Sequence, residues 1–169
     1  MTAFDRPPVL VLMGVSGSGK STVAHVLHDK LGWEFVEGDE LHTALNVAKM
    51  ASGHPLDDAD REPWLHRVRE RIDAAVAAGH PAVVTCSALK RHYRDELRDP
   101  HVVFVFLCGS RDLLLARLRA RHGHFMPPTL LDSQLADLEP PGPDEQAVTV
   151  DVSRPPPVQA DEIMAELAL

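Results

Sequence analysis

The chain has 169 residues, 44% of them hydrophobic, and a formal net charge of −8 at pH 7. This length suits one domain with a substantial buried core, so we expect residues 1–169 to form a single domain. The acidic balance argues against a protein that binds nucleic acid or anionic membranes, because such binding depends on broad basic surfaces. No apolar run is long enough to span a membrane, and acidic Asp5 stands where a signal peptide would be basic and apolar. We therefore expect a cytoplasmic protein.

The first motif is GVSGSGKS at residues 14–21, which fits the phosphate-binding pattern G-x-x-x-x-G-K-[ST] at every fixed position. The unbroken apolar run at 9–13 predicts a buried parallel strand before it. Apolar residues on one face of 21–31 predict a helix after it. Between a strand and a helix N-terminus, such a loop (the P-loop) directs backbone N–H groups at phosphate oxygens. The motif therefore predicts an ATP site.

Within the P-loop and the following residue we assign nucleotide contacts to consecutive positions: Gly14, Val15, Ser16, Gly17, Ser18, Gly19, Lys20, Ser21 and Thr22. Lys20 is expected to act in catalysis by reaching the β- and γ-phosphates, and Ser21 to offer its hydroxyl to Mg²⁺. The alternative, a glycine-rich turn without a ligand, is disfavoured because motif, lysine and flanking elements agree.

Residues 33–37 predict a second strand, and a helix is expected from about 40 to 49. Asp39 lies just past the end of that strand. Ligands bind at the carboxyl edge of parallel strands, where the P-loop also opens, so Asp39 is our candidate to accept or orient the acceptor's hydroxyl proton. The alternative is that Asp39 only caps the next helix.

Basic residues gather in the middle of the chain. A helix with acidic residues in its first turn is expected from about 57 to 78, where Gly79 ends it, and a third strand at 82–86 leads into a short helix that ends near 98. Candidates to bind an anionic acceptor are Arg61, Lys90, Arg91 and Arg94. For each of them an ordinary ion-paired surface charge remains the alternative.

The last third predicts a fourth strand at 102–107, a helix at 111–121, another at 129–138, a fifth strand at 147–152 and a terminal helix. Arg117 and Arg121 are spaced to share one helical face, and we expect both to close over the phosphates, Arg121 as a catalytic residue. The alternative is an ordinary surface face of that helix. The lid would cover about 117–137. The predicted fold is α/β, a P-loop kinase-type three-layer sandwich with a five-stranded parallel sheet, helices on both faces and an arginine-bearing lid.

A P-loop alone does not separate kinases from other nucleotide-binding proteins. The chain lacks the N-K-x-D segment of GTPases, whereas a carboxylate, a basic cluster and lid arginines are parts that phosphoryl transfer requires. These features favour a small-molecule kinase. Shikimate-like and nucleoside-monophosphate-like kinases remain alternatives, as does a nucleotide-binding regulator without transfer activity. The charge disfavours an ATPase that processes nucleic acid.

Longer segments resemble the gluconokinase family of P-loop sugar-acid kinases across nearly the whole chain. They read GDELH at 38–42, GHPL at 53–56, PWL at 63–65, CSALKR at 86–91 and HFMP at 124–127. The resemblance implies transfer of the ATP γ-phosphate to the 6-hydroxyl of D-gluconate, with Mg²⁺, giving 6-phospho-D-gluconate and ADP. It also implies a homodimer.

Gluconate carries a carboxylate and several hydroxyls, so its site needs a cation and polar partners. We expect substrate contacts from Asp39, His42, Lys49, Arg61, Lys90, Arg91, His124 and Gln134. Arg61 or Lys90 would bind the carboxylate. One departure is Thr43, where the family usually has proline, and we expect it to loosen the start of the following helix.

Overall fold

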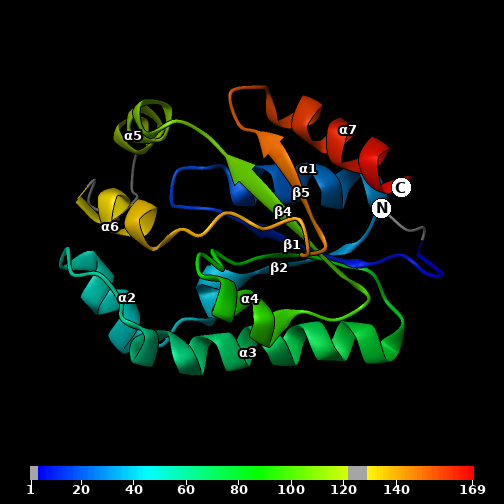
Figure 1. Cartoon of the computed structure of the whole chain (residues 1–169), viewed down its shortest axis with the longest axis horizontal. Coiled ribbons are helices and arrows are strands. Elements are labelled where there is room, and N and C mark those ends of the chain that lie inside the picture. Colours follow the sequence, from blue (N-terminus) through cyan, green and yellow to red (C-terminus); the bar gives the residue numbers. More distant parts are fainter. Residues whose placement is uncertain (1–3, 122–128) are drawn as a thin grey trace.

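The computed structural model describes residues 4–121 and 129–169, which form a central sheet between two layers of helices (Figure 1). The five strands found in these residues are all parallel and lie in the order β2-β3-β1-β4-β5. They are β1 (Val9–Met13), β2 (Glu34–Glu37), β3 (Ala82–Thr85), β4 (Val102–Cys108) and β5 (Ala147–Asp151). The predicted α/β fold with a five-stranded parallel sheet is confirmed.

Helices connect the strands and cover both faces of the sheet. They are α1 (Lys20–Leu31), the short 3₁₀ turn η1 (Gly38–Leu41), α2 (Ala44–Ala51), α3 (Asp58–Ala78), α4 (Arg91–Leu97), α5 (Arg111–Ala120), α6 (Thr129–Asp137) and α7 (Pro156–Leu167). Figure 1 shows α3 and α4 on one side of the sheet and α7 on the other. None of the helices in the described ranges is long and apolar enough to cross a bilayer.

The central strand β1 explains why the sheet is covered on both sides. All its residues are at most 1% exposed, and successive side chains point to opposite faces. Leu10 and Leu12 join the core under α1 and α7, whereas Val9, Val11 and Met13 join the core over α3. The continuous apolar run at 9–13 therefore supplies two cores at once.

The segment after β2 differs from the single helix expected over 40–49. It forms η1 and then α2, because the backbone is extended at His42 (ψ 148°) and at Thr43 (ψ 156°). The expectation that Thr43 loosens the helix start is wrong. Its hydroxyl accepts a hydrogen bond from the Asn46 N–H at 3.2 Å and caps α2.

Local capping signals set other helix ends as expected. Asp57 and Asp60 form a reciprocal capping box at the start of α3, and Gly79 ends that helix with a left-handed backbone (φ 69°). Helix α5 ends one residue earlier than predicted. Arg121 has an extended backbone (ψ 122°), so the expectation that Arg117 and Arg121 share one helical face is wrong.

Candidate active site

The P-loop leaves the carboxyl end of β1 between the ends of β3 and β4. Gly17 requires its residue type twice over, since its φ is 83° and a Cβ there would lie 3.0 Å from Leu118. The loop borders a cavity of about 440 Å³, the P-loop cavity, whose far wall comes from α5 and α7. All positions from Ser16 to Thr22 line it, as do Arg117 and Arg121. The structure thus brings most of the predicted nucleotide contacts together.

Lys20 is buried within the loop. Its Nζ donates to the carbonyl oxygens of Gly14 at 2.9 Å and Val15 at 3.2 Å. Burial lowers the pKa of its ammonium, while the nearby Asp39 carboxylate acts in the opposite direction. An incoming phosphate would offer this ammonium oxygen partners of stronger charge than the two carbonyl groups.

Ser21 is joined to Glu37, a residue that the sequence analysis did not single out. The Ser21 hydroxyl donates to Glu37 Oε2 at 2.5 Å, and Thr85 Oγ1 donates to Glu37 Oε1 at 2.5 Å. The signal was present, because Glu37 ends β2 at the same sheet edge as the P-loop. Hydroxyl and carboxylate oxygens are ligands that suit Mg²⁺, so this pair fits the predicted metal at Ser21.

Asp39 follows a glycine that is held from both sides. The Gly38 N–H donates to Thr85 Oγ1 at 3.0 Å, and Trp64 Nε1 donates to the Gly38 carbonyl oxygen at 2.8 Å. A Cβ on Gly38 would lie 1.7 Å from the Thr85 carbonyl oxygen, so no side chain fits. Asp39 itself does not cap a helix, because Glu37 precedes η1 and Thr43 caps α2. The capping alternative is wrong.

A second cavity of about 260 Å³, the Trp64 cavity, lies beside the P-loop cavity. The two cavities share Ser16, Lys20 and Asp39 in their linings. The rest of its wall comes from α2 and the loop after it, from α3, from the segment after β3 and from α6. A ligand in this cavity would therefore meet a phosphate group at the P-loop.

His42 lies in the wall of the Trp64 cavity and stacks on the Trp64 ring, with centroids 4.2 Å apart. Burial lowers the pKa of His42 to about 4, and the Arg61 charge acts in the same direction against the opposing effect of Asp39. The imidazole is therefore neutral at pH 7 and offers one donor and one acceptor.

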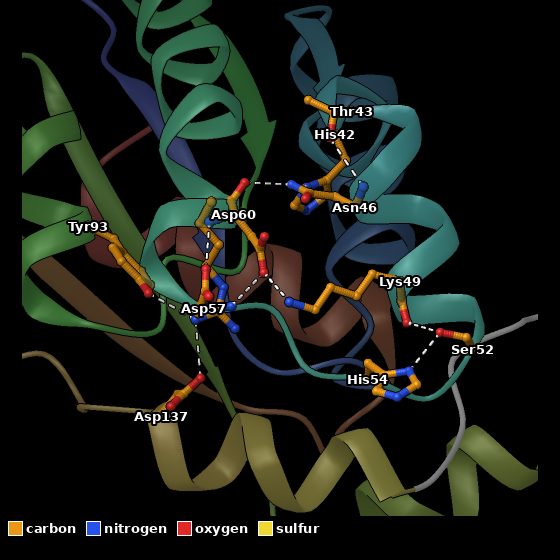
Figure 2. Close-up of polar contacts among 11 residues, drawn as sticks. His42, Thr43, Asn46, Lys49, Ser52, His54, Asp57, Asp60, Tyr93 and Asp137 are labelled. Atoms are coloured by element: carbon orange, nitrogen blue, oxygen red, sulfur yellow. Dashed lines mark hydrogen bonds and ion pairs between the residues drawn. The ribbon is translucent and has the colours of Figure 1, made fainter.

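Arg61 is the predicted acceptor-binding cation that reaches this cavity. The residue is 7% exposed, and Nη1 donates to Tyr93 Oη at 2.9 Å and to Asp137 Oδ2 at 3.1 Å. Figure 2 shows Tyr93 and Asp137 on one side of Asp57 and Asp60, and Lys49 and Asn46 on the other. The arginine thereby connects α3 to α6 at the cavity wall.

The other predicted cations lie outside the lining of the Trp64 cavity. Lys49 pairs with Asp60 at 2.6 Å, Lys90 with Asp58 at 2.9 Å, and Arg91 with Asp144 at 2.5 Å. Arg94 is buried and pairs with Glu145 at 2.7 Å. The ion pairs of Lys90 and Arg91 match the surface-charge alternative, and buried Arg94 has a structural role. Lys49, predicted as a polar wall residue, is ion-paired as well.

The comparisons with known proteins agree with this geometry. A family model described as an AAA domain matches residues 9–141. A gluconokinase from Gluconobacter oxydans is 52% identical over 161 residues, which cover 94% of this chain and 90% of that protein. The chain belongs to the gluconokinase family. A solved gluconokinase from Sinorhizobium meliloti superimposes with a TM-score of 0.86 at 48% identity, covering 96% of this chain and 92% of the other.

A solved sugar kinase from a Janibacter species is also similar, with a TM-score of 0.91 at 46% identity, covering 96% of this chain and 95% of that one. Each of these two similarities covers 96% of this chain, which includes the strands and helices that border both cavities. The recognition of the family from residues 38–91 and 124–127 is confirmed.

Helix α6 brings one more predicted residue to the junction of the cavities. Gln134 Oε1 accepts from the Ser16 N–H at 2.8 Å, and its Nε2 donates to Ser16 Oγ at 3.2 Å. Gln134 lines the Trp64 cavity. The predicted contact His124 and the middle of the predicted lid, residues 122–128, lie outside the described residues.

Sequence reasoning also passed over Trp64 and Thr85 as site residues. Both hold Gly38 through hydrogen bonds, and the Trp64 ring lines the cavity as well. Trp64 stood within the PWL segment that carried the family resemblance, but nothing in the linear order placed it against Gly38. Only the packing of α3 on the end of β2 shows that role.

Proposed function

We propose that this chain transfers the γ-phosphate of ATP to the 6-hydroxyl of D-gluconate, giving 6-phospho-D-gluconate and ADP, within a single kinase domain. One observation carries the proposal: the P-loop cavity and the Trp64 cavity meet at Ser16, Lys20 and Asp39. Membership of the gluconokinase family supports gluconate as the acceptor.

The nucleotide side is supported by two unsatisfied groups. Among the described residues, the buried side-chain atoms without a hydrogen-bond partner are Ser18 Oγ and Gln159 Oε1. Both residues line the P-loop cavity, where a polar ligand could satisfy them. Ser21, with Glu37 behind it, would hold Mg²⁺, which neutralises charge on the β- and γ-phosphates when bound.

In the proposed transfer, Asp39 accepts the proton of the 6-hydroxyl while that oxygen forms its bond to the γ-phosphorus. The bond from phosphorus to the β–γ bridging oxygen breaks, and ADP leaves. Lys20 stabilises the charge of the transferring group, and Arg117 and Arg121 contribute positive charge from the opposite wall of the P-loop cavity. Asp39 is exposed and adjacent to both cavities, so its carboxylate can reach the acceptor.

On the acceptor side we assign the carboxylate to Arg61. Arg61 lines the Trp64 cavity, whereas Lys90 does not. Nη1 is occupied by Tyr93 and Asp137, and the other guanidinium donors, which bond to no residue in the described ranges, would form a bidentate pair with a carboxylate. Neutral His42 and Gln134 would serve the hydroxyls. A cavity of about 260 Å³ suits a small acid and is tight for a nucleoside monophosphate.

The acceptor test measures ADP release from MgATP with D-gluconate, shikimate, nucleoside monophosphates and no acceptor. Turnover with gluconate alone is the expected result. Turnover with another acceptor instead would refute the gluconate assignment and leave a kinase. ATP binding without turnover on any acceptor would support the alternative of a nucleotide-binding regulator that lacks transfer activity.

The anchor test compares D-gluconate with D-glucitol, a polyol of the same length that lacks the carboxylate. Arg61→Lys should raise the KM for gluconate about tenfold or more, because the bidentate geometry is lost, and should change the weak use of glucitol little. Lys90→Gln is the matched control and should leave the KM for gluconate and the turnover of glucitol near their wild-type values. A larger effect from Lys90→Gln would move the anchor to that residue.

The homodimer and the cytoplasmic location belong to the same proposal; the homodimer rests on the family resemblance, and the location rests on the sequence pattern alone. Light scattering coupled to gel filtration measures the molar mass in solution. A mass of twice 18.6 kDa is expected, and the single-chain mass would refute the dimer.

A further inference from the structure

Gln159 is an almost fully buried amide in the first turn of α7. It is 1% exposed, and its Nε2 donates to the Arg154 carbonyl oxygen at 2.8 Å. Its Oε1 is one of the two buried side-chain atoms without a partner among the residues that the structure describes. A buried acceptor left unpaired destabilises the folded chain, so the group calls for an explanation.

The orientation of this amide is determined by its neighbour. The Arg154 carbonyl can only accept a hydrogen bond, so the NH₂ end of Gln159 must face it. Flipping the amide would place two acceptor oxygens against each other. The end without a partner among the described residues is therefore an acceptor, which a donor group of a bound molecule could satisfy.

Gln159 also lines the P-loop cavity, on the wall opposite the P-loop. Pro156 from the same turn and Arg117 from α5 line that wall with it. Figure 1 shows the first turn of α7, in orange, on the same side of the molecule as α5. Arg117 is held there by its hydrogen bond to the Val152 carbonyl oxygen. With the phosphates at the P-loop, this wall is where the base of a nucleotide would lie.

We infer that Gln159 recognises the nucleotide base, its side-chain carbonyl accepting a hydrogen bond from the exocyclic 6-amino group of adenine. This inference rests on the proposed use of ATP and is independent of which acceptor is phosphorylated. A purine without an amino group at position 6 gives the carbonyl no such donor. Gln159 is thus a specificity-determining residue for the nucleotide.

The test measures equilibrium binding by calorimetry, without any acceptor, for two ligands. One is MgATP, and the other is the Mg²⁺ complex of purine riboside triphosphate, which has hydrogen in place of the 6-amino group. Wild type should bind ATP about tenfold more tightly, the upper range for one neutral hydrogen bond. Gln159→Leu should weaken ATP binding to the level of the purine analogue and leave the analogue's affinity unchanged.

Val158→Ala is the matched control, because Val158 is an exposed neighbour in the same helical turn. It should preserve the preference for ATP. Equal weakening of both ligands by Gln159→Leu would show a structural role and overturn the inference, as would equal binding of both by wild type. Because no acceptor is present, a failure of the gluconate assignment appears only in the turnover assay and is distinguishable. Absence of ATP binding in wild type would overturn both.

Discussion

The P-loop cavity and the Trp64 cavity are built in different ways although they share Ser16, Lys20 and Asp39. One wall of the P-loop cavity is a contiguous stretch, residues 16–22, whose backbone shape depends on its glycines. The Trp64 cavity is assembled from segments far apart in the chain, and Arg61 in its wall is held by Tyr93 and Asp137 from two other helices. Phosphate recognition is therefore local, whereas acceptor recognition depends on how α3 and α6 pack.

This difference predicts two kinds of mutational effect. Changes at the shared residues should act on the transfer step itself. Changes at residues that only hold the Trp64 cavity together should act through the position of Asp39 or through acceptor affinity, and should be smaller.

The largest effect is expected from Lys20→Ala. Loss of the ammonium at the transferring phosphate should lower kcat about 10²–10³-fold, the usual loss for one such electrostatic group. The fold should survive, because Lys20 is buried at a cost in desolvation and bonds only to loop carbonyls. Steady-state kinetics and thermal unfolding measure both effects. Lys30→Ala, at the exposed end of α1, is the control, and near-normal turnover of Lys20→Ala would refute its role.

Asp39→Asn should follow, with kcat lowered by about 10²-fold or more and the KM for ATP changed little. The amide keeps the shape of the side chain but cannot accept the hydroxyl proton. The matched control is Glu40→Gln, an exposed acid at the next position, which should be neutral. If Asp39→Asn weakened ATP binding as strongly as turnover, Asp39 would act on the nucleotide instead.

Trp64→Phe tests whether the clamp on Gly38 positions Asp39. The phenyl ring can still stack on His42, but the hydrogen bond to the Gly38 carbonyl is lost. We expect kcat to fall about 3–10-fold with the KM for ATP unchanged, measured well below the unfolding temperature. Phe104→Leu, in the same hydrophobic core, should lower stability without that change in kcat. Equal loss of kcat in both variants would reduce Trp64 to a packing role.

The smallest effect concerns pH. The pKa of His42 is lowered from 6.5 to about 4 in the folded chain, so between these values the unfolded chain binds the proton more strongly. The contribution of neutral His42 to the free energy of unfolding should therefore be fully present above about pH 6.5. It should be lost progressively as the pH decreases from about 6.5 to 4. Thermal unfolding across this range should show a smaller acid loss for His42→Phe than for wild type. The exposed His54→Phe should behave like wild type, and an identical acid loss in all three would contradict the prediction.

How far the sequence predicts this molecule depends on how local each signal is. The strand at 9–13, the P-loop and the two ends of the helix predicted over about 57–78 follow from neighbouring residues, and each lies close to where it was predicted. Two predictions were wrong: that the helix at 111 extends to Arg121, and that one helix covers 40–49. Both outcomes depend on backbone angles at single residues that no local pattern specifies.

Among the predicted cations, residue type did not separate those at the site from those in surface ion pairs. Arg61 reaches the Trp64 cavity while Lys49, Lys90 and Arg91 pair with Asp60, Asp58 and Asp144. All four have the charge that an anionic acceptor requires. Their distinction depends on which acidic residue lies within reach after α3, α4 and the segment before β5 have packed.

By itself, the sequence determined the parallel sheet, the P-loop and the family, because strand burial, glycine spacing and motif order are properties of contiguous residues. Only the tertiary structure decided that Trp64 and Thr85 hold Gly38, that Glu37 binds Ser21, and that Gln159 faces the P-loop cavity. These contacts join residues from different strands and helices. Their partners come together only when the sheet and its helices bury their apolar faces.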